Sequence, residues 1–538
     1  MSGESFKHHA PTGAVATQQS AIVVGDEDGG SIMSADEQLK ALGHQPELRR
    51  THTFWTLLAL QTTILTTWSC NIVLYDYVFT LGGPMSMIYT TIIVGIGQTL
   101  LMASHAEYAG IWPHAGGQQF YTQRVAPARY MRFLSYVVGW CVLISEISTS
   151  SSSAVNSAEI MSAFIEYQYP DVAWKPWMTF LIYIVFLLGP VVTNLTPSIL
   201  PHLSLWGGIF NMTGFAVWMA VFLAMAPRNS TEFVFTKFIN ESGWSSSGWL
   251  FFMAMYVPMY GLYGTDSTTH LVEEMKNPAK DGPRVMIWSM VISTVISFTS
   301  AIVMGFTTGN WQSEMQTTLP YFTWFVDTTE SVIGGGTFCS IVNMGLNYLI
   351  IVHTNTAGSR LAWRMAKDNG LPFPRYFSHV SKRFGTPLRA MFAVLFLNVV
   401  AGRSPSLIVL TSILTSSGCL ILFSDLAFWA LISGGSLTLQ IAYAVPVICV
   451  LCRGRKILPP RPWFDLGQCG LLINYISAAW ACTTMLLFLF PQYVPVVGNI
   501  ENMNWAPAIF GICVLVCGLY WIASGRKKYM MTCGDNDS

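Results

Sequence analysis

Charged residues are scarce in this sequence. Asp, Glu, Lys and Arg make up only 10% of its 538 residues, whereas about a quarter is usual in soluble proteins. Hydrophobic residues make up 52%. A soluble protein this apolar would need amphipathic helices with charged faces, and the long apolar stretches of this chain have none. We therefore expect most of the chain to lie in a membrane.

Several signatures of other function classes are also missing. No GxxxxGK[ST] motif occurs, which disfavours an ATP-powered pump. The ten histidines are scattered without the spacing of a metal site or a nucleophilic centre, which disfavours an enzyme and predicts neither a bound metal nor a cofactor. Cys449 and Cys452 form a CxxC without a second ligand pair, so we interpret them as unpaired packing cysteines. The formal net charge is zero, which gives no sign of a nucleic-acid partner.

Twelve apolar stretches are long enough to cross a bilayer core of roughly 30 Å as helices. Lipid offers no partners to backbone groups, and the stretches are too long and too uniformly apolar for barrel strands. The predicted fold class is therefore all-α integral membrane, with about twelve transmembrane helices. Their expected limits are Phe54–Tyr75, Met85–Ala109, Phe133–Phe164, Trp177–Leu195, Leu205–Ala226, Trp249–Gly261 continuing unevenly to Leu271, Val285–Phe306, Thr337–His353, Ala390–Val400, Cys419–Leu451, Leu466–Phe490 and Trp505–Ala523.

The positions of the basic residues predict the orientation. None of the 28 Lys and Arg falls within a predicted span. With the N-terminus in the cytosol, 24 lie on the cytosolic side, and four lie outside: Lys175, Arg228, Lys237 and Arg403. We therefore expect both termini to be cytosolic, in a multi-pass protein of the plasma membrane. If one span more or fewer were counted, the loops rich in Lys and Arg would no longer all fall on the cytosolic side.

The domain organisation is expected to be simple. Residues 1–50 are polar and predict a disordered cytosolic tail, with a short helix from Ala35 to Arg50 and no cleavable signal. Residues 51–525 form the transporter domain, and residues 526–538 a short cytosolic tail. One apolar segment, from Arg403 to Gly418, is too short for a span and too apolar for a loop. We interpret it either as a re-entrant piece or as an artefact of gene-model translation.

Two sequons are candidate glycosylation sites. Asn229 and Asn240 lie in the predicted outer loop after the fifth span. The sequons at Asn194 and Asn211 are discounted because they lie at or inside the membrane.

Two predicted spans contain residues that weaken a helix near its middle. The first span is interrupted at Thr66–Ser69 and the sixth at Gly261–Asp266, with Pro258 one turn earlier. The alternative is a simple kink, but breaks five spans apart predict a five-plus-five inverted repeat, followed by two C-terminal helices. Broken helices expose backbone N–H groups to anions and carbonyls to cations.

Loop motifs then connect the chain to a known group. Ala106-Glu107-Tyr108 and Trp112–Gly117 resemble the "AE…P.aGG" signature of the amino acid–polyamine–organocation superfamily. The sequence from Gly264 to Glu274 resembles the "GyD…H..EE" run of the fungal GABA and choline permeases. Further matches in loops are Ser359-Arg360, Ala366–Asp368, Leu371-Pro372 and Asn504-Trp505. The resemblance covers Ala41 to Lys528. Thr265 and Tyr263 depart from the usual pattern, so the substrate's identity does not follow.

The resemblance implies that the substrate lies at the two breaks. No Lys or Arg is in a span, so a substrate carboxylate would be held by backbone N–H groups at Thr67–Ser69 and Gly264–Ser267. Glu146, Asp266 and Asp425 are acids within predicted spans, which favours a cationic or zwitterionic ligand. The candidate substrate-binding residues are Thr66, Thr67, Trp68, Ser69, Glu146, Tyr263, Gly264, Thr265 and Asp266.

The proton-coupling candidates are Glu146, Asp266 and His270. Glu146 is the first choice for amine partner or proton carrier, and the alternative is a protonated carboxyl bonded to Ser148–Ser153. Asp266 would either bind the ammonium or cap the second half of span 6. His270, one turn later, would be a proton relay or a structural hydrogen-bond donor.

Other residues are assigned simpler roles. Trp68 and Tyr263 are the aromatic residues best placed to face an ammonium group. Glu107 and Glu273-Glu274 lie near the cytosolic edge and are interpreted as gate or fold residues.

The expected function is secondary active, proton-driven uptake of an amino acid, GABA, choline or a related amine. The alternative is a non-transporting nutrient sensor on the same fold, which the short tails without motifs disfavour. The expected partners are the small-molecule substrate, protons and the lipid bilayer.

Overall fold

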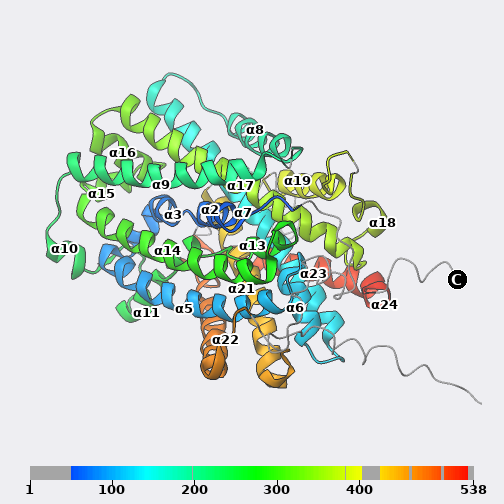
Figure 1. The fold of residues 1–538 in the computed structure, drawn as a ribbon. Coiled ribbons are helices and arrows are strands. Elements are labelled where there is room, and N and C mark those ends of the chain that lie inside the picture. Colours follow the sequence, from blue (N-terminus) through cyan, green and yellow to red (C-terminus); the bar gives the residue numbers. More distant parts are fainter. Residues whose placement is uncertain are drawn as a thin grey trace, which may run out of the picture.

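The computed structural model describes residues 50–196, 198–381, 383–402, 425–459, 463–497 and 502–530, which form a bundle of helices (Figure 1). Apart from Arg50, the predicted N-terminal tail and its short helix lie outside the described residues. The apolar segment Arg403–Gly418 also lies outside them.

Nine helices of the described part are long and apolar enough to cross a membrane. They are α5 (Gly83–Ile111), α7 (Met131–Gln168), α8 (Pro176–Asn194), α9 (Leu200–Met225), α14 (Pro278–Thr307), α17 (Thr337–Lys367), α21 (Asp425–Arg453), α22 (Gly470–Leu487) and α23 (Ala506–Tyr520). A tenth apolar helix, α19 (Leu388–Gly402), is shorter. With the two broken spans described below, these helices confirm the twelve predicted spans.

Short elements gather at the two ends of the bundle. One end carries α10 (Thr231–Phe235), α15 (Trp311–Glu314) and α16 (Pro320–Thr329), and we call it the α15 end. The other carries α6 (Gly117–Val125), α18 (Pro374–Phe377) and α24 (Arg526–Lys528) (Figure 1), and we call it the basic end because α17 and α21 finish there at Lys367 and Arg453. Two short strands, β1 (Leu81–Gly82) and β2 (Ile239–Asn240), pair antiparallel. Other short elements are the 3-10 turns Val272–Glu274, Arg455–Ile457 and Gly467–Cys469, and the π-helical turns Val332–Gly336 and Trp521–Gly525.

Spans that are five apart in the sequence pack side by side. The second and seventh spans, α5 and α14, contact each other along their lengths, and so do the third and eighth, α7 and α17. The fourth and ninth, α8 and α19, also pack together, while α22 and α23 pack on the outside of α21. This arrangement agrees with the predicted five-plus-five repeat and its two additional C-terminal helices.

The first span is broken where the sequence predicts. Its first half, α2 (Phe54–Leu65), begins with a capping box in which Thr53 and Thr56 each bond the other's backbone N–H. The helix ends at Thr66, whose φ of 30° lies in the left-handed region that β-branched residues rarely adopt. The chain then continues as α3 (Thr67–Val73) and α4 (Tyr75–Thr80).

The sixth span is broken at the same depth. It consists of α11 (Ser247–Ala254), α12 (Tyr256–Gly261) and α13 (Ser267–His270). Between the last two, Gly264 has a φ of +85°, which favours glycine. Since α12 packs against α3, the two breaks lie side by side inside the bundle.

Candidate functional site

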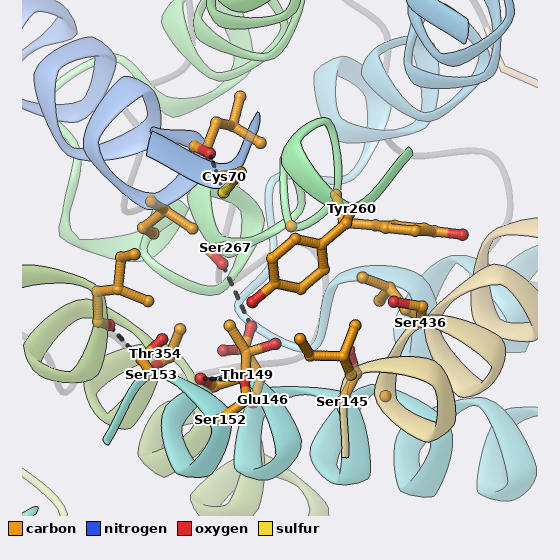
Figure 2. Close-up of a pocket in the computed structure, with 18 of the residues that line it drawn as sticks. Cys70, Ser145, Glu146, Thr149, Ser152, Ser153, Tyr260, Ser267, Thr354 and Ser436 are labelled. Carbon is orange, nitrogen blue, oxygen red and sulfur yellow. Dashed lines mark hydrogen bonds between the residues drawn. The ribbon is translucent and has the colours of Figure 1, made fainter. Parts of the chain in front are cut away.

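A cavity opens beside the two breaks (Figure 2). It contains about 630 Å³ of space between atoms, including its open side. Its walls come from the first, third, sixth, eighth and tenth spans. They are Ile64, Leu65, Cys70, Ser145, Glu146, Thr149, Ser152, Ser153, Tyr260, Tyr263, Gly264, Ser267, Ile350, Thr354, Leu431, Ile432, Gly435, Ser436 and Leu439.

Among the described residues of this wall, Glu146 is the charged one. Its side chain extends from α7 toward Ser267 (Figure 2), whose hydroxyl donates to Oε1 of Glu146 over 3.2 Å. The residue is only 6% exposed. Among the described residues that line the cavity there is no Lys, Arg or His. The sequence suggested Ser148–Ser153 as partners of this carboxylate, but none of the described hydrogen bonds joins them to it. Its partner is Ser267, from the broken sixth span.

Two tyrosines of the sixth span supply aromatic faces. The ring of Tyr260 reaches into the cavity beside Glu146 in Figure 2. Tyr263, a predicted site residue, also lines the cavity and packs against Phe488. The faces of tyrosine rings attract ammonium groups. Aromatic rings and a carboxylate therefore line the same cavity, where both could contact an ammonium group.

The predicted residues of the first break are divided between two directions. Thr66 and Ser69 line a second, smaller cavity that shares Tyr260 and Cys70 with the first. Thr67 donates to the backbone of Ser293 instead. These neighbouring cavities extend along α3, so the first break contributes backbone and hydroxyl groups to their walls.

Trp68 and Thr265 do not line either cavity. Trp68 donates from its ring nitrogen to Oδ1 of Asn211 over 2.8 Å and packs against Trp218. Thr265 points its hydroxyl at the sulfur of Met290. Trp68 therefore packs within the bundle, and Tyr260 occupies the aromatic position that the sequence analysis gave to Trp68.

Asp266 lies behind the cavity wall, and its Oδ1 accepts a hydrogen bond from the Tyr443 hydroxyl over 2.6 Å. The capping alternative is wrong, because Asp266 makes no side-chain hydrogen bond to the start of α13. Its other oxygen, Oδ2, lies 3.6 Å from Nε2 of His270. A carboxylate oxygen of Glu146, a carboxylate oxygen of Asp266 and a ring nitrogen of His270 all lie within 4.8 Å of one another. The three proton-coupling candidates therefore form one buried cluster.

Gln61 and Asn211 support the breaks, and sequence analysis missed both. Gln61 donates to the carbonyl of Gly264 over 2.8 Å and accepts from the backbone and hydroxyl of Thr268. Asn211 of α9 accepts from the Thr66 hydroxyl and donates to the carbonyl of Thr62. The available signal was an amide inside an apolar helix, which is costly unless it is hydrogen-bonded. Tyr443, a polar aromatic in the tenth span, was missed for want of any local signal.

The basic end is closed over the cluster by the loop Trp112–Gly117. The backbone N–H of Ala115 donates to Oε1 of Glu273 over 2.9 Å. Burial raises the pKa of Glu273, and this hydrogen bond opposes the shift. The next carboxylate, Glu274, forms a 2.9 Å ion pair with Arg360. The glutamates predicted at this edge therefore hold the loop and α17 against the end of the sixth span.

Glu107 forms a separate ion pair at the same end. Its Oε1 accepts from Arg455 over 2.6 Å and from the backbone N–H of Leu466. Glu107 ends up fully buried, so it joins the second span to the segment that follows the tenth.

The family of transporters described as "Amino acid permease" matches residues 53–515, which begin at α2 and reach into α23. The chain belongs to the amino acid permease family. This amino acid permease is therefore a multi-pass integral membrane transporter and not an enzyme.

Three curated relatives illustrate the similarity. A choline transporter of Saccharomyces cerevisiae is 26% identical over 94% of this chain and 85% of its own length. Amino-acid permease 2 of Neurospora crassa is 24% identical over 93% and 89% of the two chains. A BAT1 amino-acid permease homolog of Oryza sativa is 25% identical over 94% and 96%. The similarity spans the whole bundle of this permease.

Proposed function

We propose that this permease takes up a cationic or zwitterionic amine or amino acid by secondary active transport coupled to protons. The observation that carries the proposal is the charge of the cavity. Glu146 lies in its wall, and the described residues that line it include no basic side chain.

The physical argument concerns a carboxylate removed from water. A buried charge is costly unless it is paired, and removing one partner of a buried pair is strongly destabilising. An ammonium group in the cavity would pair with Glu146, while Tyr260 and Tyr263 would contact its alkyl groups or its charge. A simple organic anion would meet a like charge and find no fixed cation among the described residues of the wall.

A zwitterionic substrate also needs a partner for its carboxylate. At the break, the N–H of Ser69 donates to the carbonyl of Thr66, while the N–H groups of Thr67 and Trp68 make no backbone hydrogen bond among those described, and Thr66 adds no side-chain cap. Backbone N–H groups at this break are therefore the proposed carboxylate partners. Thr66 and Ser69 line the adjoining small cavity.

Proton coupling is proposed from the cluster behind the cavity. Two buried carboxylates, Glu146 and Asp266, lie close to each other and to one imidazole, that of His270. Intramembrane acids and histidines form proton relays in pumps and transporters. We place the basic end in the cytosol of a plasma-membrane protein, which makes both chain ends cytosolic.

The relatives suggest which substrates to try. One is named a choline transporter and the others are named amino-acid permeases. At 24% to 26% identity these names supply a starting panel rather than one ligand.

Uptake of labelled compounds into cells that lack their own amine and amino acid permeases tests the proposal. The panel should contain choline, GABA, cationic and neutral amino acids, and a simple carboxylate such as lactate. We expect saturable uptake of at least one amine, collapse with an uncoupler, and persistence without sodium. Preferred uptake of the carboxylate would contradict the charge argument, and strict sodium dependence would remove proton coupling. Absence of uptake with normal surface expression would favour the non-transporting sensor.

A further inference from the structure

The orientation of the His270 ring fixes which of its nitrogens carries hydrogen. Nδ1 lies 2.8 Å from the carbonyl oxygen of Ala115. A carbonyl oxygen only accepts, so Nδ1 must be the donor. In a neutral ring, the other nitrogen then carries a lone pair. That nitrogen, Nε2, lies 3.6 Å from Oδ2 of Asp266.

Asp266 presents an acceptor to this lone pair. Its Oδ1 already accepts from Tyr443, while Oδ2 and His270 Nε2 are both buried without a hydrogen-bond partner among the described residues. Both residues are fully buried. Two acceptors that face each other away from water repel, and a proton between them turns the repulsion into an ion pair.

Among the described residues, the groups around Asp266 supply no other fixed positive charge. The titratable groups that face it from neighbouring helices are His105 of α5, Tyr121 of α6, Glu146 of α7 and Tyr443 of α21. Glu146 adds negative charge, and the tyrosines are neutral. His105 directs its Nε2 at the backbone carbonyl of Tyr443, 3.0 Å away, and not at Asp266.

We propose that the coupled proton resides on Nε2 of His270 and is donated to Asp266, while Glu146 binds the substrate's ammonium group. This division of roles rests on the proposed function. Two carboxylates are then balanced by two positive charges, one from the proton and one from the amine. Because a net charge buried in the membrane is costly, each cation favours the binding of the other, and one proton accompanies each amine.

The same ring connects the proton to the closed basic end. Its Nδ1–H holds the carbonyl of Ala115, in the loop Trp112–Gly117. Gly117 lies so close that an added Cβ would be 2.9 Å from Cε1 of His270 and 2.6 Å from the hydroxyl of Thr269. When the Nε2–H bond breaks, its electron pair stays on nitrogen and the proton passes to cytosolic water. The neutral ring then faces the Asp266 carboxylate with a lone pair, and relief of this repulsion displaces the loop.

The test measures proton and amine fluxes together in liposomes that contain the purified full-length protein. The probe is the amine identified by uptake, with a trapped pH dye reporting protons. For the wild type we expect one proton per amine and accumulation driven by an inward proton gradient. His270→Gln keeps a donor for Ala115 but has no ring nitrogen to take up the proton that faces Asp266. It should retain exchange of labelled for unlabelled amine, lose accumulation, and lower the proton-to-amine ratio to near zero.

A second buried histidine provides the matched control. His353 of α17 lies 3.2 Å from the hydroxyl of Ser204, away from the cluster, so His353→Gln should keep the wild-type flux ratio. If His270→Gln does not fold, Asp266→Asn tests the same proton, because it retains an oxygen acceptor for Tyr443 and removes the charge that holds the proton.

The outcomes separate the two proposals. A wild-type flux ratio in folded His270→Gln or Asp266→Asn would overturn the assignment of the proton and leave coupled uptake intact. Amine transport by the wild type without any proton flux would overturn coupling itself, and the assignment with it. Loss of coupling in the His353→Gln control as well would also contradict the assignment, because the effect would not be specific to the cluster.

Discussion

Gln61 donates a hydrogen bond from its side-chain nitrogen to the carbonyl oxygen of Gly264, 2.8 Å away. Its side-chain oxygen accepts from the backbone N–H of Thr268, in the helix that resumes after the break. One buried amide in α2 thus bonds the Thr268 N–H and adds a second hydrogen bond to the Gly264 carbonyl, which also accepts from the N–H of Ser267. The first and sixth spans are joined where both border the cavity.

Replacing Gln61 with leucine should destabilise the protein. The change leaves the Thr268 N–H buried without its acceptor, which costs about 1–3 kcal/mol, and leaves the Gly264 carbonyl with the N–H of Ser267 as its remaining donor. We expect a clear fall in the melting temperature of the purified protein and weaker substrate binding, because the cavity wall at Gly264 loses its support.

Thr63→Val is the control for this experiment. The Thr63 hydroxyl is equally buried in α2 but bonds only the carbonyl of Ala59 in its own helix. Its loss should change stability little. If Gln61→Leu were as stable as Thr63→Val, the amide would not be what holds the two breaks together.

Glu314 predicts a pH dependence of stability. It is buried at the α15 end, where its carboxylate accepts a hydrogen bond from the Tyr75 hydroxyl. Burial raises its pKa from 4.5 to about 7, although the Tyr75 hydrogen bond opposes the shift and nearby Asp327 adds to it. The folded protein therefore holds this proton more tightly than the unfolded chain does. Its contribution to stability is complete below about pH 4.5 and is lost as the pH rises through about 7.

Glu314→Gln should remove this dependence. The amide oxygen still accepts from Tyr75, and no charge forms on raising the pH, so the melting temperature should fall less between pH 5 and pH 8 than in the wild type. Glu330→Gln, an exposed change at the same end, is the comparison. An unchanged pH slope in Glu314→Gln would show that another group controls it.

The two sequons differ in their surroundings. Asn240 is exposed on β2. Asn229 is half-buried, and its side chain donates to the carbonyls of Gly305 and Thr308 at the end of α14. We expect Asn240 to be the main glycan acceptor, so Asn240→Gln should abolish most of the glycosidase-sensitive shift on a gel, whereas Asn229→Gln should not.

Labelling of intact cells tests the predicted orientation in the membrane. The loop from Ser359 to Arg389 should be protected from membrane-impermeant labels in intact cells. Labelling of this loop from outside would reverse the predicted topology.

Much of the fold was predictable because it depends on local properties of the sequence. Apolar length defines the spans, and the break at Thr66 and the one before Asp266 follow from residues that weaken a helix. Three of the residues that the sequence proposes for the site, Glu146, Gly264 and Tyr263, lie in the cavity wall.

The direction of each side chain was less predictable. Around a helix break, a shift of one residue changes the direction of a side chain, which then faces either the cavity or a neighbouring helix. The hydrogen-bond partner that fixes this direction is distant in sequence. Trp68 turns to Asn211, 143 residues away, and Asp266 to Tyr443, 177 residues away. No periodicity within a single helix contains that information.

Glu146 offers the most direct test of the account. Glu146→Gln keeps the size of the side chain and an acceptor for the Ser267 hydroxyl but removes the charge. A carboxylate paired with a desolvated ammonium should contribute about 2 kcal/mol or more, which corresponds to at least a tenfold change in affinity. Surface expression of the variant, measured in parallel, controls for misfolding.

The decisive measurement compares the transported amine with a neutral isostere, such as choline with 3,3-dimethylbutanol, for binding to purified wild-type protein and Glu146→Gln. The wild type should bind the cation much more tightly than the neutral isostere. In Glu146→Gln the ratio of these two affinities should fall at least tenfold, while the affinity for the neutral isostere stays the same. An unchanged preference in the folded variant would contradict charge selection by Glu146.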